Sequence, residues 1–386
     1  MIALKLAYRN LVGAGLRTLL NVIVLSMAYL IIIWQQGFLD GWNRQALHDM
    51  INWEIGGGQY WQQQYDPYDP FTLEESHAPV PAALTDASVA PILIAQATIY
   101  PQGRMQNVVL KGIAPGQTVL SLPTVDLQAD IPEIPVLVGT RMAKNANLRL
   151  GDLVTVRWRD ANGTFDAAEA KVVRIMKTNV SSVDQGQLWL PLEHLQKMLR
   201  MPGEATIIVV GQETEKTGPL PNWEFLDRAV LSQDLADMIR MKRVSNSILY
   251  VILLSLALLA IFDTQVLAIF RRRKEIGTLI ALGMTRGAVI RLFTLEGAMH
   301  GILATIVAAA YGIPLLSLQA VRGIGMPEVM DSFGLAIADR IFPVYSAALV
   351  VGTTLIVLVA VTIVSFMPAR RIARLNPTDA IKGKLS

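Results

Sequence analysis

The chain has 386 residues, of which 52% are hydrophobic and only 17% are charged, and its formal net charge is +3. A soluble domain carries about 25% charged residues, so this deficit indicates that part of the chain lies in lipid. The small charge, without a basic stripe carrying interleaved aromatic residues, argues against nucleic acid as a partner. The absence of cysteine excludes disulfides, thiolate metal sites and cysteine nucleophiles, and the four histidines lack metal-ligand spacing.

Four apolar stretches are long enough to cross a bilayer, which takes about 20 helical residues. They cover residues 18–39, 244–270, 292–321 and 341–367. The first stretch is longer than the apolar core of a signal peptide, and no small-residue cleavage site follows it. We therefore expect four transmembrane helices, the first of them uncleaved.

Lysine and arginine in short flanking segments mark the cytoplasmic side of a membrane. Basic residues gather in segments 1–17, 271–291 and 368–386. We therefore expect both termini in the cytoplasm, residues 322–340 as a short outer loop, and residues 40–243 outside the cytoplasm. That side is the periplasm if the cell has two membranes.

Residues 40–243 are numerous enough to form a folded core. Alternating and β-branched runs predict strands at 92–99, 107–113, 153–158, 171–175 and 206–210, and Asp160-Ala-Asn-Gly163 predicts a hairpin turn. Helical spacing predicts helices at 141–148, 192–199 and 222–242, the last of which is expected to continue into the second span. The predicted fold class is a membrane protein with four transmembrane α-helices plus a large extracytoplasmic α+β domain between helices 1 and 2.

An aromatic cluster falls near the start of this outer domain. Its members are Trp53, Tyr60, Trp61, Tyr65 and Tyr68. Such a cluster can contact a lipid or a peptide, but a core edge or an interfacial belt is the favoured interpretation.

No motif for catalysis is visible in the chain. It has no G-x-x-x-x-G-K-[ST] phosphate loop, no G-x-S-x-G and no H-E-x-x-H, and the glycines at 56–58 are not followed by lysine. We therefore expect no enzyme activity and no cofactor in this chain. Any work that it performs must draw its energy from a partner.

The connection 271–291 is too long and too apolar for a plain turn between two spans. Four apolar residues predict a short amphipathic helix: Ile276, Leu279, Ile280 and Leu282. Gly283 is expected to end it, and a second helix is expected to start near Thr285 and merge into the third span. The residues fit either insertion into a groove of another protein or a helix that lies on the membrane.

The string Arg273-Lys-Glu-Ile-Gly277, followed by Leu279, Ala281-Leu-Gly283 and Glu296-Gly297, resembles the core of FtsX/MacB-type permease domains. Pro368-Ala-Arg-Arg371 with Asn376-Pro-Thr-Asp-Ala-Ile381 is similar to the C-terminal signature of that superfamily, and Leu6-Ala-Tyr-Arg-Asn10 to its N-terminal amphipathic helix. Pro135-Val-Leu-Val-Gly-Thr-Arg-Met-Ala143 and Trp189-Leu-Pro-Leu-Glu193 are similar to the lipoprotein-releasing LolC/LolE-type permeases.

The resemblance implies a bacterial inner-membrane complex that works by mechanotransmission. A separate ABC ATPase dimer would bind ATP and Mg, and a second permease subunit, identical or homologous, would stand beside this chain. A lipoprotein would pass from the membrane to a periplasmic chaperone. The domain at 40–243 would combine a porter-like part with a small β-rich part inserted at about 135–190.

The resemblance also implies two sets of site residues. The ATPase would dock on a coupling helix formed by Glu275, Ile276, Gly277, Leu279, Ile280, Leu282, Gly283 and Met284. Substrate would enter between the first two spans and meet Val22, Leu25, Tyr29, Ile33, Ile248 and Val251.

Three ionisable residues fall inside the predicted spans. We expect Asp263 to snorkel or to pair with an arginine such as Arg17, because a carboxylate is costly in lipid. Glu296 and His300 are four residues apart on one helix face, with Glu296 near Arg291, and are expected to form a helix-packing pair.

Two alternative functions remain open at this point. One is a MacB-type efflux permease for peptides or amphiphiles, which would work with an outer-membrane channel. The other is an FtsX-like signalling subunit that transports nothing and controls a cell-wall hydrolase.

Overall fold

The computed structural model describes residues 15–69, 72, 75–84, 86–214, 218, 220–326 and 340–372. Most of the predicted amphipathic helix at 1–17, most of the outer loop at 322–340 and the tail from 373 onwards lie outside these residues. The chain divides into a helical unit, whose described parts lie at 15–42, 239–324 and 341–372, and a sheet unit, which takes in residues 43–238.

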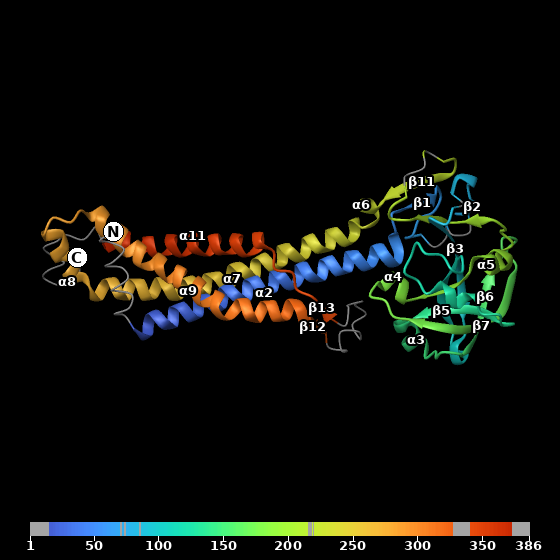
Figure 1. Cartoon of the computed structure of the whole chain (residues 1–386), viewed down its shortest axis with the longest axis horizontal. Helices are drawn as coiled ribbons and strands as arrows, with labels where there is room; N and C mark the ends of the chain where they lie inside the picture. Colours follow the sequence, from blue (N-terminus) through green and yellow to red (C-terminus); the bar gives the residue numbers. More distant parts are fainter. Residues whose placement is uncertain are drawn as a thin grey trace. The chain divides into compact units, whose positions relative to one another are not determined.

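Four helices in the described part are long and apolar enough to cross a membrane (Figure 1). They are α2 (Leu16–Met50), α7 (Gln233–Arg271), α9 (Arg286–Arg322) and α11 (Ala347–Ile372). α2 and α7 extend well beyond the predicted spans, since the added residues include strong helix formers such as Leu235, Met238 and Lys242. α11 begins later than predicted, after Pro343, because proline disfavours helical backbone in the residue before it.

The interior of the helical unit is built around one face of α2. Val22, Leu25, Tyr29 and Ile33 are buried there against apolar side chains of α7, α9 and α11. Polar side chains add directional contacts between the same helices. The Tyr29 hydroxyl lies 2.5 Å from Thr354 Oγ1, and the Tyr311 hydroxyl donates to Ser26 Oγ at 3.2 Å. One face of α2 therefore contributes to the core shared with α7, α9 and α11.

Two glycines let α2 approach the segment that leads into α11. Gly37 and Gly41 form a G-x-x-x-G pair, a spacing that permits close backbone packing in membrane proteins. The Val344 N–H donates to the Gly37 carbonyl at 2.8 Å. A Cβ built on Gly41 would lie 2.1 Å from the Phe342 carbonyl oxygen, so no larger residue fits without backbone movement.

The sheet unit contains a nine-stranded sheet in the order β11-β1-β10-β3-β4-β8-β5-β7-β6. Its strands are β1 (Gly58–Gln62), β3 (Val89–Ile99), β4 (Gln106–Ile113), β5 (Ile134–Gly139), β6 (Leu153–Arg159), β7 (Phe165–Met176), β8 (Gln187–Pro191), β10 (Ile207–Val210) and β11 (Trp223–Asp227). All five predicted strands are confirmed, whereas β1, β5, β8 and β11 were not predicted.

Six of these strands close into a barrel. β3 pairs with β4 on one side and with β6 on the other, so that β3, β4, β8, β5, β7 and β6 form a ring. Residues 134–191 therefore do not form a separate sheet, because their strands complete a barrel with β3 and β4. The β4–β8 and β5–β7 pairs are parallel, and the other pairs of the ring are antiparallel.

The barrel separates two apolar cores. Inward-facing residues such as Leu93, Leu110 and Val172 form the first core, together with α3 (Thr140–Ala146) and α5 (Leu192–Leu199). The second core lies on the other side of the strands and includes Ile113, Leu137 and Trp189, together with η5 (Thr124–Gln128).

Local turn and helix predictions in this unit have mixed outcomes. The Asp160–Gly163 turn joins β6 to β7, with Asp160 Oδ1 accepting from the Thr164 N–H at 2.8 Å, so this prediction is confirmed. The predicted helix at 222–242 is wrong in its first part. There the chain forms β11, which pairs with β1, then the short helix α6 (Arg228–Leu231), and only then α7.

One strand of the barrel carries a buried lysine. Lys111 lies opposite Trp189 in the β4–β8 register, with its ammonium 5.1 Å from the indole centre. Burial lowers the pKa of Lys111 below its ordinary value. Between that lowered pKa and the ordinary value near 10.5, the unfolded chain binds more protons than the folded chain. The free energy of unfolding therefore rises with pH in this window, as the cost of burying the Lys111 ammonium group falls.

We expect Lys111→Met to raise the urea midpoint at about pH 7, because it removes the cost of burying an ammonium group. The gain should shrink as the pH rises past the ordinary lysine value near 10.5, where the lysine becomes neutral in both the folded and the unfolded state. Lys197→Met, on an exposed side chain of α5, is the matched control. An equal gain in the control, or a gain that does not change with pH, would contradict the prediction.

Candidate partner-docking site

A short helix, α8 (Arg273–Ala281), connects α7 to α9 (Figure 1). It ends at Ala281, with Leu282 as its C-cap, and Gly283 follows with a φ of +97°, which a residue with a side chain rarely adopts. The N-cap of the next helix is Thr285, whose Oγ1 accepts from the Ala288 N–H at 3.3 Å. The structure thus confirms the predicted helix, its glycine stop and the second helix that merges into the third span.

One face of α8 is turned towards its own chain. Ile276 is 3% exposed and packs with Ile269, Val289 and Phe293, while Ile280 and Met284 lie at the edge of this cluster. Gly277 is buried as well. These predicted docking residues anchor α8 on α7 and α9, so they are not on its exposed surface. The prediction identified the apolar face correctly, this face packs within the chain, and the docking of an ATPase on α8 stays a prediction.

The opposite face of α8 is exposed. Lys274, Thr278, Ala281 and Leu282 have the spacing of one helix face, and Leu282 is 81% exposed. A leucine this exposed at the end of a short helix is well placed to enter an apolar pocket of another protein. We call Lys274, Thr278, Ala281 and Leu282 the α8 outer face. The side chain of Leu279 lies outside the described residues.

An arginine joins α8 to the helices on both sides of it. Arg272 Nε and one Nη lie 2.8 and 2.9 Å from the two carboxylate oxygens of Glu275, and its other Nη lies 3.1 Å from Glu296 Oε2. The hydrogen bonds from Arg272 lower the pKa of Glu275, and those to Glu275 raise the pKa of Arg272. Glu275, although exposed, is therefore already paired within this chain.

This arrangement corrects the predicted surroundings of Glu296. Its ion-pair partner in the described part is Arg272, whereas Arg291 is exposed. His300 Nδ1 donates to the Glu296 carbonyl oxygen at 3.1 Å, and both side chains are buried. Glu296 and His300 therefore pack together as predicted. The cation that pairs with Glu296 is Arg272, at the α7–α8 junction, and not Arg291. The three-residue spacing of Arg272 and Glu275 was a sequence signal for their own ion pair, but it does not point to Glu296.

The predicted substrate-facing residues fall into two groups. Ile248 and Val251 on α7 are exposed, 63% and 64% respectively. The four residues on α2 are buried inside the helical unit instead: Val22, Leu25, Tyr29 and Ile33. They therefore cannot form an outer contact surface in this structure. The exposed side of α2 consists of other residues: Leu19, Ile23, Met27, Ile31 and Trp34.

Asp263 also lies on the exposed side of α7. Among the residues that the structure describes, its carboxylate has no hydrogen-bond or ion-pair partner. The side chain of Arg17, its expected partner, lies outside the described residues. That expectation stays a prediction.

The aromatic cluster is divided between the two sides of the sheet. Tyr60 is buried against Phe225, with ring centres 4.9 Å apart. Trp61 and Tyr65 meet edge to face at 5.0 Å and border the second apolar core. Tyr68 is exposed, and its hydroxyl bonds to Asp234. The cluster is thus a core edge, as the favoured interpretation predicted.

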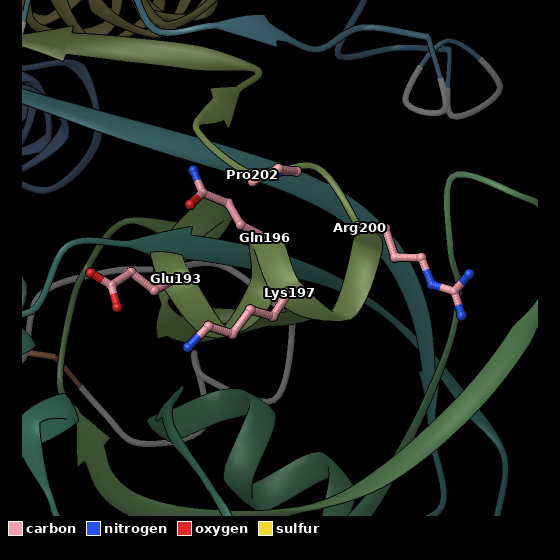
Figure 2. Close-up of a pocket in the computed structure, with 5 residues that line it drawn as sticks. All are labelled: Glu193, Gln196, Lys197, Arg200 and Pro202. Atoms are coloured by element: carbon pink, nitrogen blue, oxygen red, sulfur yellow. The ribbon is translucent and has the colours of Figure 1, made fainter.

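A pocket of about 480 Å³ lies beside α5 in the sheet unit (Figure 2). It is lined by Glu193, Gln196, Lys197, Arg200 and Pro202. Arg200 points away from the other labelled side chains, and its Nε lies 3.1 Å from Asp160 Oδ2. The lining has both signs of charge and no convergent set of polar groups. It therefore favours no particular ligand.

Comparisons with known proteins identify the helical unit. Residues 247–377 match the family model of the FtsX-like permease C-terminal domain, which takes in most of α7 and all of α8, α9 and α11. The lipoprotein-releasing system transmembrane protein LolC of Xylella fastidiosa is 23% identical, over 78% of this chain and 80% of the relative. LolC of Neisseria meningitidis is 19% identical, over 76% and 78%.

A third relative aligns with a shorter part of the chain. An uncharacterized ABC transporter permease of Methanocaldococcus jannaschii is 28% identical, over 32% of this chain and 29% of the relative. The matched permease domain contains α8 and its outer face. The four long apolar helices indicate a membrane protein, and the matched permease domain and the LolC relatives support an ABC transporter permease of the FtsX/LolC type.

Proposed function

We propose that this chain is the transmembrane subunit of an ATP-driven complex in a bacterial inner membrane that releases lipoproteins for delivery towards the outer membrane. The observation that carries the proposal is the alignment with LolC proteins over most of both chains, which is too long to lie in the helical unit alone and so takes in at least part of the sheet unit. The substrate class is taken from the names of those relatives, which are transmembrane proteins of lipoprotein-releasing systems.

The proposed orientation rests on the positions of basic side chains. Lys274, Arg286 and Arg291 are exposed around α8, where the positive-inside rule favours the cytoplasm. Both termini would then be cytoplasmic as well, and the sheet unit would lie in the periplasm. In that position it could receive a lipoprotein and pass it to a periplasmic chaperone.

In the proposed mechanism a separate ABC ATPase dimer binds ATP and Mg, because this chain has no phosphate loop. FtsX/LolC-type permeases generally work with such partners. The ATPase would bind the α8 outer face, and its closure would be passed through the membrane helices to the sheet unit. A second permease subunit would complete the complex. The exposed sides of α2 and α7 would contact that subunit, the substrate or lipid.

We expect Leu282→Asp to reduce co-purification of the ATPase at least about tenfold, because a central apolar anchor typically contributes 2 kcal/mol or more to an interface. The tagged chain would be extracted from native membranes in mild detergent, and bound proteins would be measured by quantitative mass spectrometry. Leu150→Asp is the matched control, since Leu150 is 65% exposed but belongs to the sheet unit.

The same experiment distinguishes the alternatives. An ATPase together with an acylated lipoprotein supports lipoprotein release. An ATPase with an adaptor and an outer-membrane channel indicates MacB-type efflux, and a cell-wall hydrolase indicates FtsX-like signalling. If no ATPase accompanies the unsubstituted chain under conditions that preserve known complexes, the proposal is wrong.

A further inference from the structure

Arg272 occupies the junction between α7 and α8. Its N–H donates to the Ala268 carbonyl at 3.1 Å, a bond at the end of α7. Its carbonyl accepts from the Ile276 N–H at 2.9 Å, a bond at the start of α8. Its φ of −95° and ψ of 14° are not helical. The backbone of Arg272 is therefore the point at which the direction of α8 relative to α7 is set.

The guanidinium of Arg272 then ties α8 to a third helix. It holds both carboxylate oxygens of Glu275 in the first turn of α8, and the same group reaches Glu296 on α9. Its centre also lies 5.2 Å from the centre of the Phe293 ring on α9. The planar fork of arginine can make all these contacts at once, which a lysine ammonium cannot do.

Burial distinguishes this group from a surface ion pair. The side chain of Glu296 is 9% exposed and that of Arg272 is 22% exposed. An exposed pair contributes little, whereas removal of one partner of a buried pair leaves an uncompensated charge. Displacement of Arg272 would thus remove a cation from the buried Glu296 carboxylate.

The apolar contacts of α8 cannot fix its orientation by themselves. Ile276 packs against Val289 and Phe293, and such contacts are non-directional, so they hold α8 close to α9 without fixing its rotation. The hydrogen bonds of Arg272 have defined directions. They would determine which residues α8 presents on its outer face.

We propose that Arg272 is a positioning residue that clamps α8 to α9 through Glu275 and Glu296, so that α8 and α9 move as one body. The proposed clamp rests only on the contacts of Arg272 within this chain. The consequence that a pull on α8 by the ATPase moves α9 rests on the proposed function.

Distances between spin labels test the clamp directly. The chain has no cysteine, so two introduced cysteines are the only labelled positions. Leu282→Cys on α8 and Ile302→Cys on α9 are both at exposed sites, and their separation in the purified full-length chain reports the orientation of α8. A second pair, Ile302→Cys with Ile356→Cys, reports the packing of α9 against α11.

We expect a narrow distribution for the first pair in the parent chain and at least a twofold broader one in Arg272→Gln. Arg271→Gln is the matched control, because it removes the same charge one residue earlier from an exposed side chain. It should leave the distribution narrow. Arg272→Lys should give an intermediate width, since one ammonium cannot hold both carboxylates in the same geometry.

The double variant Arg272→Gln with Glu296→Gln separates positioning from general stability. It removes the uncompensated charge, so the α9–α11 distance should match that of the parent, whereas the α8–α9 distribution should remain broad. If Arg272→Gln alone disturbs the α9–α11 distance, the double variant decides the question. A narrow α8–α9 distribution in the double variant would overturn the proposal.

A separate measurement tests the consequence for the complex. With the co-purified ATPase, Arg272→Gln should retain the bound ATPase but lower its ATP hydrolysis at least about fivefold, whereas Arg271→Gln should not. Unchanged hydrolysis with a broadened α8 would show that the clamp exists but transmits nothing, which would overturn the consequence. Absence of any ATPase would refute the proposed function and leave the distance result valid.

Discussion

Arg141→Met is expected to destabilise the sheet unit by about 3–5 kcal/mol, because it leaves a buried carboxylate without its cation. Arg141 on α3 lies 2.6 Å from Asp184 Oδ2, and the Asp184 side chain is only 1% exposed. The Arg141 N–H donates to the other carboxylate oxygen at 3.2 Å. Methionine keeps most of the volume of the arginine stem, so the loss would come mainly from the missing charge and hydrogen bonds.

There is no room for Asp184 to relax after this change. A Cβ built on Gly139 would lie 2.3 Å from Asp184 Oδ1, so the backbone at the end of β5 closes one side of the carboxylate. Burial raises the pKa of Asp184, and the bonds from Arg141 oppose this rise. In the variant the side-chain bond and the charge of Arg141 are gone, whereas the backbone N–H of residue 141 still donates to Asp184. The loss of unfolding free energy in Arg141→Met should therefore be largest at neutral pH. It should shrink as the pH falls and Asp184 becomes protonated.

Urea unfolding followed by tryptophan fluorescence measures this effect, since five of the seven tryptophans lie in residues 43–238. Arg174→Met is the matched control. Arg174 lies 3.6 Å from Asp126, but both side chains are exposed, 57% and 40%, so about 0–1 kcal/mol is expected. Equal losses in the two variants would show that the Arg141 pair behaves like a surface pair.

Gly41→Ala is expected to destabilise the helical unit by about 1–3 kcal/mol, the usual range for overpacking. Its added Cβ would lie 2.1 Å from the Phe342 carbonyl oxygen and 2.9 Å from the Pro343 Cα. Both contacts are with backbone, so the segment before α11 must move away from α2. A rotamer change cannot relieve the clash.

Gly352→Ala on α11 provides the comparison, because no atom lies within 4 Å of its added Cβ. Alanine is the better helix former, so this control should be neutral or slightly stabilising. The measurement is the fraction of monodisperse protein that remains after heating in detergent, followed by size-exclusion chromatography. If Gly41→Ala survives heating as well as Gly352→Ala, the close approach of α2 to residues 342–343 is not required.

The strands predicted from sequence are those with an alternating pattern or a run of β-branched residues, such as β6 and β10. β6 alternates exposed and buried residues along its length, which is a period of two. β5 and β8 are buried almost throughout, and a short apolar run of this kind does not distinguish a strand from a helix by periodicity. The helical spacing of apolar residues predicted a helix where β11 lies. The segment forms a strand instead, because pairing with β1 overrides its local pattern.

The candidate site shows the same limit in another form. Apolar spacing in α8 correctly indicated that one face is covered, but it could not indicate whether another protein or the same chain covers it. α2 is apolar on all sides, so its sequence does not separate the buried Leu25 from the exposed Met27. In a membrane, lipid and a neighbouring helix favour similar side chains, and only packing distinguishes them.

Closure of the barrel also has a consequence for solubility. A strand at the edge of a sheet offers unpaired N–H and C=O groups, and such edges promote aggregation between copies. In the described sheet the ring leaves only one end open, at β11, since β6 at the other end is joined to β3. β11 has five residues and exposes Glu224 and Asp227, and a short, negatively charged edge repels another copy of itself. The sheet unit should therefore resist edge-to-edge aggregation even at high local concentration.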